Sequence, residues 1–206
     1  MLKFAVMVSG GGTDLQSLID ATQSGKINAE ICCVIASKPD IYAITRAKNA
    51  NIPVKVIVRR DFEELQKFDQ AILNALHEVQ ADFVVLAGYL NIVGKKTIKA
   101  YRNKILNIHP SLIPSFCGMG YYGSKVHESV IAYGAKVSGA TVHFVDEKAD
   151  TGPIIMQKAV EVFSDDTPQT LAARVLRIEH EILPEVVSKM AEEKIIVDGR
   201  RVTILE

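Results

Sequence analysis

Three kinds of feature are scarce in this chain of 206 residues. It has only three cysteines, it has no apolar run of the ~18 residues that a membrane helix needs, and its 24 lysines and arginines balance 24 aspartates and glutamates. Three cysteines are too few for a disulfide framework, and they include no CxxC pair. Zero net charge leaves no long-range field to collect a polyanion, which disfavours nucleic acid binding by bulk electrostatics. Any anion site must then be local.

The cysteines give little reason to expect redox chemistry, and the first residues give little reason to expect secretion. Cys32 and Cys33 are neighbours in an apolar run, where strand alternation predicts that they point to opposite faces, and Cys117 stands alone in a loop. We expect all three to be reduced thiols that act as small apolar residues. The first twelve residues, MLKFAVMVSGGG, reach their glycines too early for a secretory signal. We therefore expect a cytoplasmic protein that contacts neither a membrane nor nucleic acid.

The composition is that of a folded protein. Hydrophobic residues make up 48% and charged residues 23% of the chain, and the length predicts a single domain spanning 1–206. Strand and helix patterns alternate through the first half, which predicts a doubly wound α/β sheet. The predicted strands there are 3–8, 29–36, 54–58 and 83–86, and the predicted helices are one that carries Leu15, Leu18 and Ile19, then 42–50 and 62–79.

The second half of the chain does not continue the regular alternation of predicted strands and helices. A short apolar run at 105–108 leads into Pro110, which ends the strand, and a loop rich in Gly, Pro and Tyr follows. Beyond this loop the predicted elements are a helix at 126–133, strands at 137–145 and 154–162, a helix at 167–192 and a small hairpin within 194–205.

A glycine turn joins the first predicted strand to the first helix in the run Ser9-Gly10-Gly11-Gly12-Thr13-Asp14. Glycines let backbone N–H groups approach a ligand, and the helix presents its free amides and positive dipole end. The run lacks the Gly-Lys-Ser/Thr of a Walker loop, and Leu15 stands where a dinucleotide fingerprint needs its third glycine. A phosphate monoester fits better than NAD or ATP. The alternative is a plain turn with Thr13 or Asp14 as N-cap.

Asn107 and His109 lie two residues apart at the end of a predicted strand, so they share one face near its carboxyl end, where open α/β sheets bind ligands. An amide N–H₂ can hold an oxyanion while an imidazole carries a proton, as acyl transfer to nitrogen requires. The alternative is a packed or surface histidine.

Asp150 lies in the turn Lys148-Ala149-Asp150-Thr151-Gly152-Pro153. Beside a catalytic histidine it would raise the imidazole pKa and fix the ring's orientation, and alone it would be a turn-former. His143 lies on the strand that leads into this turn, as a supporting or simply packed histidine. No histidine has the i, i+4 partner of a zinc site, so no metal is expected.

These motifs, in this order, resemble the phosphoribosylglycinamide formyltransferase family, which is folate-dependent and belongs to purine synthesis. The resemblance covers nearly the whole chain and implies one doubly wound, mostly parallel sheet with helices on both faces. The matching stretches are the glycine turn 9–16, Leu86-Ala87-Gly88-Tyr89, Asn107 to Pro114 and Gly139 to Gly152.

The resemblance also implies roles for individual residues. His109 would donate a proton, Asn107 would stabilise the tetrahedral oxyanion and Asp150 would hold His109. The formyl group would come from 10-formyltetrahydrofolate, and the acceptor would be the amine of glycinamide ribonucleotide. The implied ribonucleotide ligands are Gly11, Gly12, Thr13, Asp14 and Glu179, with the phosphate half at about 1–100. The implied folate ligands are Leu90, Asn91, Ile92, Val93, Asn107, Asp146 and Asp150, with the folate and catalytic half at about 101–192.

The chain departs from the family pattern at several positions. Asn91 and Leu65 stand where relatives carry arginines near the folate tail, and the loop 117–123 differs from the shorter histidine-bearing form. Asp14 stands where asparagine is common, so its carboxylate is expected to turn away from the phosphate and cap the helix.

Alternatives with the same chemistry are a formyltetrahydrofolate hydrolase and a methionyl-tRNA formyltransferase. Each carries an additional domain, and we expect neither in 206 residues that begin at the first strand. A non-catalytic sensor of nucleotide phosphates would keep the glycine turn without needing Asn107, His109 and Asp150 together. A monomer and a homodimer both remain open.

Overall fold

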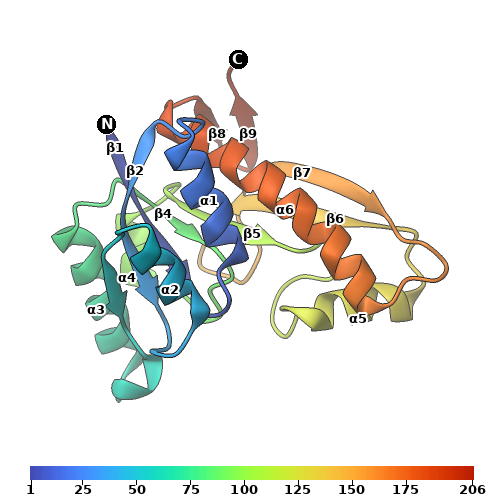
Figure 1. Cartoon of the computed structure of the whole chain (residues 1–206), viewed down its shortest axis with the longest axis horizontal. Coiled ribbons are helices and arrows are strands. Elements are labelled where there is room, and N and C mark those ends of the chain that lie inside the picture. Colours follow the sequence, from blue (N-terminus) through green and yellow to red (C-terminus); the bar gives the residue numbers. More distant parts are fainter.

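A continuous seven-stranded sheet forms the centre of the computed structural model, which describes residues 1–206 (Figure 1). The strand order is β3-β2-β1-β4-β5-β6-β7, with β1 to β5 parallel and the last two pairings antiparallel. The strands are β1 (Leu2–Val8), β2 (Ala29–Ala36), β3 (Val54–Val56), β4 (Phe83–Leu86), β5 (Ile105–His109), β6 (Val137–Phe144) and β7 (Ile154–Glu161). The predicted doubly wound, mostly parallel α/β fold is confirmed.

Helices connect the strands and cover the sheet. They are α1 (Thr13–Gln23), α2 (Tyr42–Asn49), the short 3₁₀ helix η1 (Arg59–Asp61), α3 (Leu65–Glu78), α4 (Lys95–Ala100), α5 (Ser124–Tyr133) and α6 (Pro168–Ala191). The predicted terminal hairpin forms a separate two-stranded sheet, β8 (Ile195–Asp198) with β9 (Arg201–Ile204). None of the helices combines the length and apolar composition that a membrane crossing requires.

Both faces of the sheet are buried, because each inner strand presents apolar side chains in two directions. In β1, Phe4, Val6 and Val8 belong to one hydrophobic cluster, while Ala5 and Met7 belong to the other. The first cluster packs under α1, α2, α5 and α6, and Figure 1 shows α1 and α6 lying across this face. The second packs under α3 and α4. Burial on both sides explains the continuous apolar runs of the parallel strands.

The two neighbouring cysteines do not point to opposite faces, so that prediction is wrong. The pairing of β1 with β2 shifts register at Cys32, whose Sγ–H donates to the Phe4 carbonyl (3.3 Å). This bulge resets the alternation, and both Cys32 and Cys33 contact the cluster under α3 and α4. Burial raises the pKa of the Cys32 thiol to about 11, and all three thiols are free.

Helix α4 has no counterpart among the predicted elements. Its N-terminal amides are held by a carboxylate of another helix, because Asp69 of α3 accepts from Lys96 N (2.9 Å) and Thr97 N (3.3 Å). The Thr97 hydroxyl also donates to Asp69 (2.5 Å). A Cβ on Gly94 would overlap the Asp69 side chain, so the helix starts at a residue that leaves room for this cap. Local sequence carries no sign of a partner 27 residues away.

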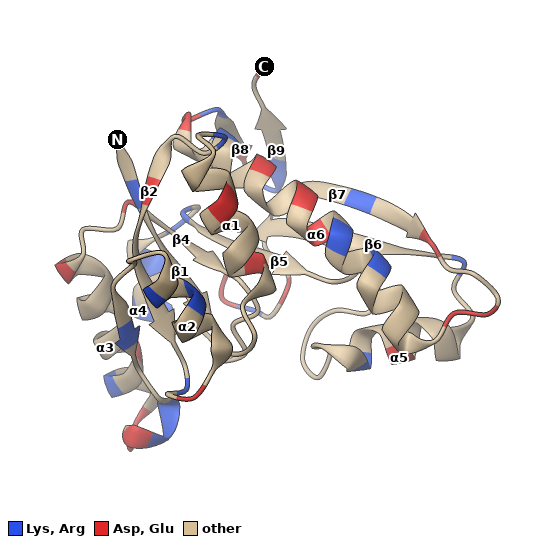
Figure 2. Ribbon diagram, viewed as in Figure 1, with Lys and Arg blue, Asp and Glu red and all other residues tan.

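The charges are dispersed over the molecule. Figure 2 shows lysines, arginines and acidic residues interspersed along the visible helices and strands. Electrostatic recognition therefore depends on local groups. The carboxyl ends of the parallel strands are the place to look for them, because the chain leaves β1 and β4 toward opposite sides of the sheet, and open α/β sheets bind ligands at such a switch point.

Candidate active site

The antiparallel pairing of β5 with β6 builds the polar cluster predicted from the Asn-Ile-His motif. Asn107 lies opposite His143, and His109 lies opposite Thr141. Asn107 Nδ2 is 3.0 Å from His143 Nε2, and His143 Nδ1 is 2.8 Å from the Phe144 carbonyl oxygen. A carbonyl can only accept, so His143 Nδ1 carries the hydrogen and Nε2 accepts from the Asn107 amide. His143 thereby fixes the orientation of that amide.

Asp150 reaches the same cluster from the turn between β6 and β7. Its Oδ2 lies 3.7 Å from His109 Nδ1, and its Oδ1 lies 3.7 Å from His143 Nε2. The Gly118 amide donates to Asp150 Oδ2 (2.8 Å), and Asp150 holds a positive φ of 56°. Three segments distant in sequence thus meet here, and the predicted convergence of Asn107, His109 and Asp150 is confirmed.

The pKa of His109 is set by opposing effects, of which the predicted influence of Asp150 is only one. Burial lowers it below the ordinary histidine value, although the Phe116 carbonyl and the Asp150 carboxylate both act to raise it, and His143 lowers it further. The contribution of Asp150 has the predicted sign, but desolvation outweighs it. In the free protein His109 is therefore a neutral imidazole whose Nε2–H donates to the Phe116 carbonyl (3.0 Å).

Asp150 itself stays ionised. Burial would raise the pKa of its carboxyl group, but its polar surroundings, which include the donating Gly118 amide, hold that pKa below the usual aspartate value. A carboxylate therefore faces the neutral ring of His109 and stabilises positive charge on that ring whenever a proton arrives.

A hydrogen-bonded network behind the cluster fixes the loop after β5. The Thr141 hydroxyl donates to the Ser111 carbonyl (2.6 Å) and accepts from Ile113 N (3.1 Å) and Gln157 Nε2 (2.9 Å). The Ser111 hydroxyl in turn donates to the Ser115 carbonyl (2.6 Å). This support was not predicted from the sequence, yet Thr141 is two residues before His143 on β6, so strand alternation places both on one face.

His127 is a further residue that the sequence analysis did not select. It is buried on α5, its Nδ1 has no hydrogen-bond partner, and burial followed by the proximity of His109 lowers its pKa. No spacing in the sequence links His127 to His109, because only the packing of α5 brings them close.

The glycine turn at the end of β1 presents open backbone. Gly12 is the N-cap of α1 with φ 72°, and a Cβ there would lie 2.7 Å from Ala43 Cβ, so this position needs glycine. Added Cβ atoms on Gly10 and Gly11 would meet nothing within 4 Å. The first helical bond runs from Gln16 N to the Gly12 carbonyl, so the amides of the preceding residues are free to bind an anion.

Arg46 of α2, which was not predicted from the sequence, adds a cation to this turn. Its Nε donates to the Gly11 carbonyl (2.9 Å) and its Nη1 to Gln16 Oε1 (3.0 Å). An arginine held against the turn complements an anion bound there. It lies 35 residues from Gly11 in sequence, which no local motif connects.

Asp14 does not cap α1, so that prediction is wrong. The helix has no side-chain cap, and the buried Asp14 instead faces α6, with Oδ1 3.6 Å from His180 Nε2. Burial raises the pKa of Asp14 to about 6, and burial with the nearby Asp14 charge raises the pKa of Glu179 to about 8. The carboxyl group of Glu179 is therefore largely protonated at neutral pH and can donate a hydrogen bond.

The expected folate segment follows β4 at the same edge. Leu90 and Ile92 are exposed, with 56% and 64% of their surface accessible, whereas Val93 is buried against α3 and α4. Leu90 N donates to Ser9 Oγ (2.9 Å), which ties the segment to the end of β1. The Val93 side chain is therefore not available to a ligand.

Asp146 uses its carboxylate within its own turn. It accepts from the Thr151 hydroxyl (2.6 Å) and from Lys148 N (3.2 Å). The turn can therefore offer backbone groups to a ligand. No group of three histidine, cysteine, aspartate or glutamate side chains is placed to hold a metal ion.

Comparison with known proteins places these groups in a family. The family model described as formyl transferase matches residues 2–187. The chloroplastic phosphoribosylglycinamide formyltransferase of Vigna unguiculata is 42% identical over 194 residues, which are 94% of this chain and 62% of that protein. Phosphoribosylglycinamide formyltransferase of Haemophilus influenzae is 41% identical over 95% of this chain and 90% of its own length.

A solved structure agrees in three dimensions. Glycinamide ribonucleotide transformylase 1 from Symbiobacterium toebii superimposes with a TM-score of 0.95 at 38% identity, covering 100% of this chain and 95% of that one. The chain, with its matched domain and its converging Asn107, His109 and Asp150, belongs to the formyl transferase family.

Proposed function

We propose that this protein transfers the formyl group of 10-formyltetrahydrofolate to the amino group of 5′-phosphoribosylglycinamide, which yields N-formylglycinamide ribonucleotide and tetrahydrofolate in purine biosynthesis. The observation that carries the proposal is the convergence of Asn107, His109 and Asp150 beside an open phosphate-binding turn. The proposed reaction takes place in the cytoplasm and requires neither a metal nor nucleic acid. The enzyme acts as a monomer or a homodimer.

The ribonucleotide lies at the end of β1 in this proposal. Its phosphate accepts from the backbone amides of Gly11, Gly12 and Thr13, with Arg46 as the nearby cation. Glu179 meets the ribose hydroxyl groups from α6. Its largely protonated carboxyl group also avoids placing a second full negative charge beside the phosphate.

The folate co-substrate lies at the carboxyl ends of β4 and β5 in this proposal. Its pterin ring lies against the segment Leu90 to Val93 and the turn at Asp146, where backbone groups pair with the polar ring edge and exposed apolar side chains contact the ring face. The two halves of the chain then divide the task, with about 1–100 holding the phosphate and about 101–192 holding the folate and the catalytic groups. Glu179 is the ribonucleotide ligand that comes from the second half.

Asn107 serves the tetrahedral intermediate. Attack of the substrate amine on the formyl carbon turns the formyl oxygen into an oxyanion, which needs a fixed donor. One N–H of the Asn107 amide is used by His143 Nε2 (3.0 Å), and the other is free for the oxyanion. His143 acts here as a positioning residue.

His109 moves the proton. The amine acquires positive charge as it attacks, and the neutral imidazole accepts that proton at Nδ1, which faces Asp150 at 3.7 Å. The Asp150 carboxylate stabilises the imidazolium, which returns the proton to N10 as the carbon–nitrogen bond to the folate breaks. One proton leaves the amine and one reaches N10, so the transfer balances. Because the His109 imidazole is neutral before the reaction, it can first accept the proton from the amine and then donate it to N10.

The test is a formyl-transfer assay on the purified protein with both substrates. The proposal expects tetrahydrofolate and N-formylglycinamide ribonucleotide in equal amounts. Release of formate without the ribonucleotide would instead assign hydrolase activity, and ribonucleotide binding without product would assign a sensor.

A further inference from the structure

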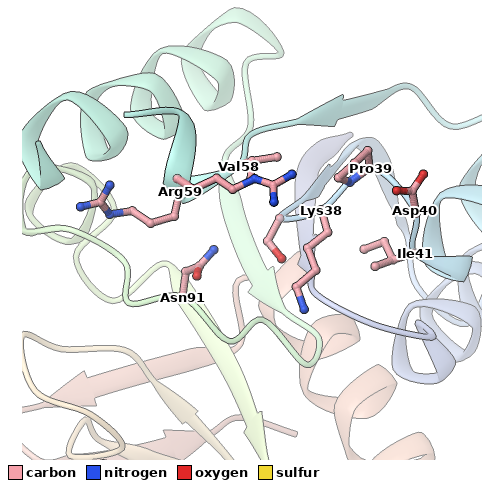
Figure 3. Close-up of a pocket in the computed structure, with 9 residues that line it drawn as sticks. Lys38, Pro39, Asp40, Ile41, Val58, Arg59 and Asn91 are labelled. Atoms are coloured by element: carbon pink, nitrogen blue, oxygen red, sulfur yellow. The ribbon is translucent and has the colours of Figure 1, made fainter. Parts of the chain in front are cut away.

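Two features of the molecule lie outside the catalytic cluster. One is a hollow of about 410 Å³ that adjoins the folate segment through Asn91, and Figure 3 shows Lys38 and Arg59 among the side chains around it. The other is the terminal hairpin of β8 and β9, which follows residues 2–187, the range of the family match. No role assigned above uses the hairpin, yet it contacts the turn that carries Asp150.

The hairpin is anchored to the body of the protein by one of its faces. Its strand β9 contacts β7, the strand that follows the Asp150 turn, and the Leu205 amide donates to the Lys194 carbonyl (2.8 Å). Ile196 points away from the body and is 51% exposed. The apolar side chains that alternate with it and pack against the first hydrophobic cluster are Ile195, Val197, Val202 and Ile204. The body of the protein therefore fixes the place of the hairpin.

The turn of the hairpin has only two residues, Gly199 and Arg200. The strands pair as far as Asp198 and Arg201, and Gly199 has a positive φ of 58°, which glycine adopts without strain. So short a turn restricts where the backbone of Arg200 can lie. Its Nη1 donates to the Thr151 carbonyl (2.9 Å), 49 residues away in the sequence. The hairpin thus holds the catalytic turn from outside.

The catalytic turn depends on such support. Asp150 has a φ of 56°, a left-handed conformation that costs free energy for a residue with a side chain. Within the turn, the Thr151 hydroxyl donates to Asp146 (2.6 Å). On the strand side, Gly152 packs so closely that an added Cβ would overlap a carbonyl oxygen of β6. Arg200 is the contact that the turn receives from the hairpin.

The place of Asp150 is critical because its two oxygens face different histidines. Oδ2 lies 3.7 Å from His109 Nδ1, and Oδ1 lies 3.7 Å from His143 Nε2. A turn that relaxes moves the carboxylate and changes both distances. The electrostatic effect on the His109 ring changes with them, and a small misplacement of a catalytic group lowers the rate of reaction.

We propose that Arg200 is a positioning residue of the formyl-transfer site, which holds the Thr151 carbonyl and thereby fixes the adjoining Asp150 carboxylate against His109. This inference rests on the proposed function. Arg200 contacts neither substrate and acts only through the turn. The terminal hairpin is then a support of the catalytic end of the site.

The experiment compares Arg200→Ala with Arg201→Ala. Arg201 is the neighbouring exposed arginine on β9, so its loss removes the same charge without the contact to Thr151. Steady-state kinetics give kcat and the KM for the ribonucleotide. NMR titration of the free protein gives the His109 pKa, and denaturant unfolding gives the stability of each variant.

Arg200→Ala should lower kcat about 3–10-fold and leave the KM for the ribonucleotide unchanged, because only the catalytic end is displaced. The His109 pKa should move further below the ordinary value, since Asp150 is one of the groups that raise it. Arg200→Lys keeps a cationic donor and should recover most of both losses. Arg201→Ala should match the wild type.

A double variant tests the route of the effect. Arg200→Ala added to Asp150→Asn should cause no further loss of kcat, because the carboxylate through which Arg200 acts is already gone. A full further loss in that background would overturn the proposal. So would an equal change in Arg201→Ala, or a loss of stability in Arg200→Ala with an unchanged His109 pKa, which would make the contact purely structural.

Failure of the proposed function would look different. A wild type without formyl transfer would overturn that function. The His109 titration needs no substrate, so it would still report whether Arg200 controls the placement of Asp150.

Discussion

The two ends of the proposed site are built by different physical means. At β5 and β6 the groups are buried side chains that hold one another, with His109 and His143 each 3.7 Å from Asp150. At the glycine turn the groups are exposed backbone amides, and only Gly12 is constrained by its neighbours. Proton transfer needs particular side chains at controlled hydration, whereas phosphate binding needs only amides and a dipole. The catalytic end should therefore depend on side-chain identity, and the phosphate end on backbone conformation.

The largest expected effect comes from removing the proton carrier. His109→Ala should lower kcat by about 10²–10⁴-fold and leave ribonucleotide affinity nearly intact, because the imidazole acts on charge that develops during transfer. Asn107→Ala should lose about 10²–10³-fold for the same reason. Steady-state kinetics with ribonucleotide calorimetry test both. Near-normal turnover of His109→Ala would contradict its role.

Asp150→Asn sharpens the comparison at the catalytic end. Asp150 is one of the groups that raise the His109 pKa, so its loss should move that pKa further below the ordinary value while kcat falls about 10²-fold. Ribonucleotide binding should persist. NMR titration of His109 alongside kcat is the measurement, and if neither changes, Asp150 is a turn-former.

Gly12→Ala tests the phosphate end. A Cβ there would lie 2.7 Å from Ala43 Cβ, and alanine is disfavoured at the φ of 72° that Gly12 adopts, so the turn must distort. We expect a loss of about 1–3 kcal/mol of unfolding free energy together with weaker ribonucleotide binding. Gly11→Ala is the matched control, because it meets nothing within 4 Å. Denaturant unfolding and calorimetry separate the two variants, and equal effects would mean that the turn conformation is unimportant.

The pH dependence of stability should be set partly by α1 and α6. Burial raises the pKa of Asp14 to about 6 and that of Glu179 to about 8, so the folded protein retains protons that the unfolded chain releases above about pH 4. Stability should therefore fall as the pH rises toward about 8, and Glu179→Gln should reduce this fall by on the order of 1–2 kcal/mol.

Unfolding free energies between pH 5 and 9 provide the measurement. Glu128→Gln, at an exposed position of α5, is the control and should leave the curve unchanged. An identical slope in Glu179→Gln and in the wild type would show that Glu179 is charged throughout this range.

The strand and helix order followed from sequence periodicity, and so did the placement of Asn107 and His109 on one face. Continuous apolar runs marked β2 and β4 at their observed limits, Ala29–Ala36 and Phe83–Leu86, because burial on both faces demands them. Helix α4 escaped prediction because its cap, Asp69, comes from α3. The bulge at Cys32 also escaped, because it depends on pairing with β1. Hydrophobic periodicity and turn residues reflect short-range preferences of the chain. The cap of α4 and the bulge in β2 depend instead on residues that are distant in the sequence.

The sequence by itself therefore determined which chemical groups are present and which strand ends carry them. Tertiary structure decided their hydrogen-bond partners, their neighbours and their protonation. It placed His143 opposite Asn107 so that one amide hydrogen stays free, brought Arg46 to the glycine turn and turned Asp14 toward His180. It also made His109 neutral, because the free energy of desolvation sums over every group that excludes water from a side chain. That sum depends on packing, and no local pattern of residues contains it.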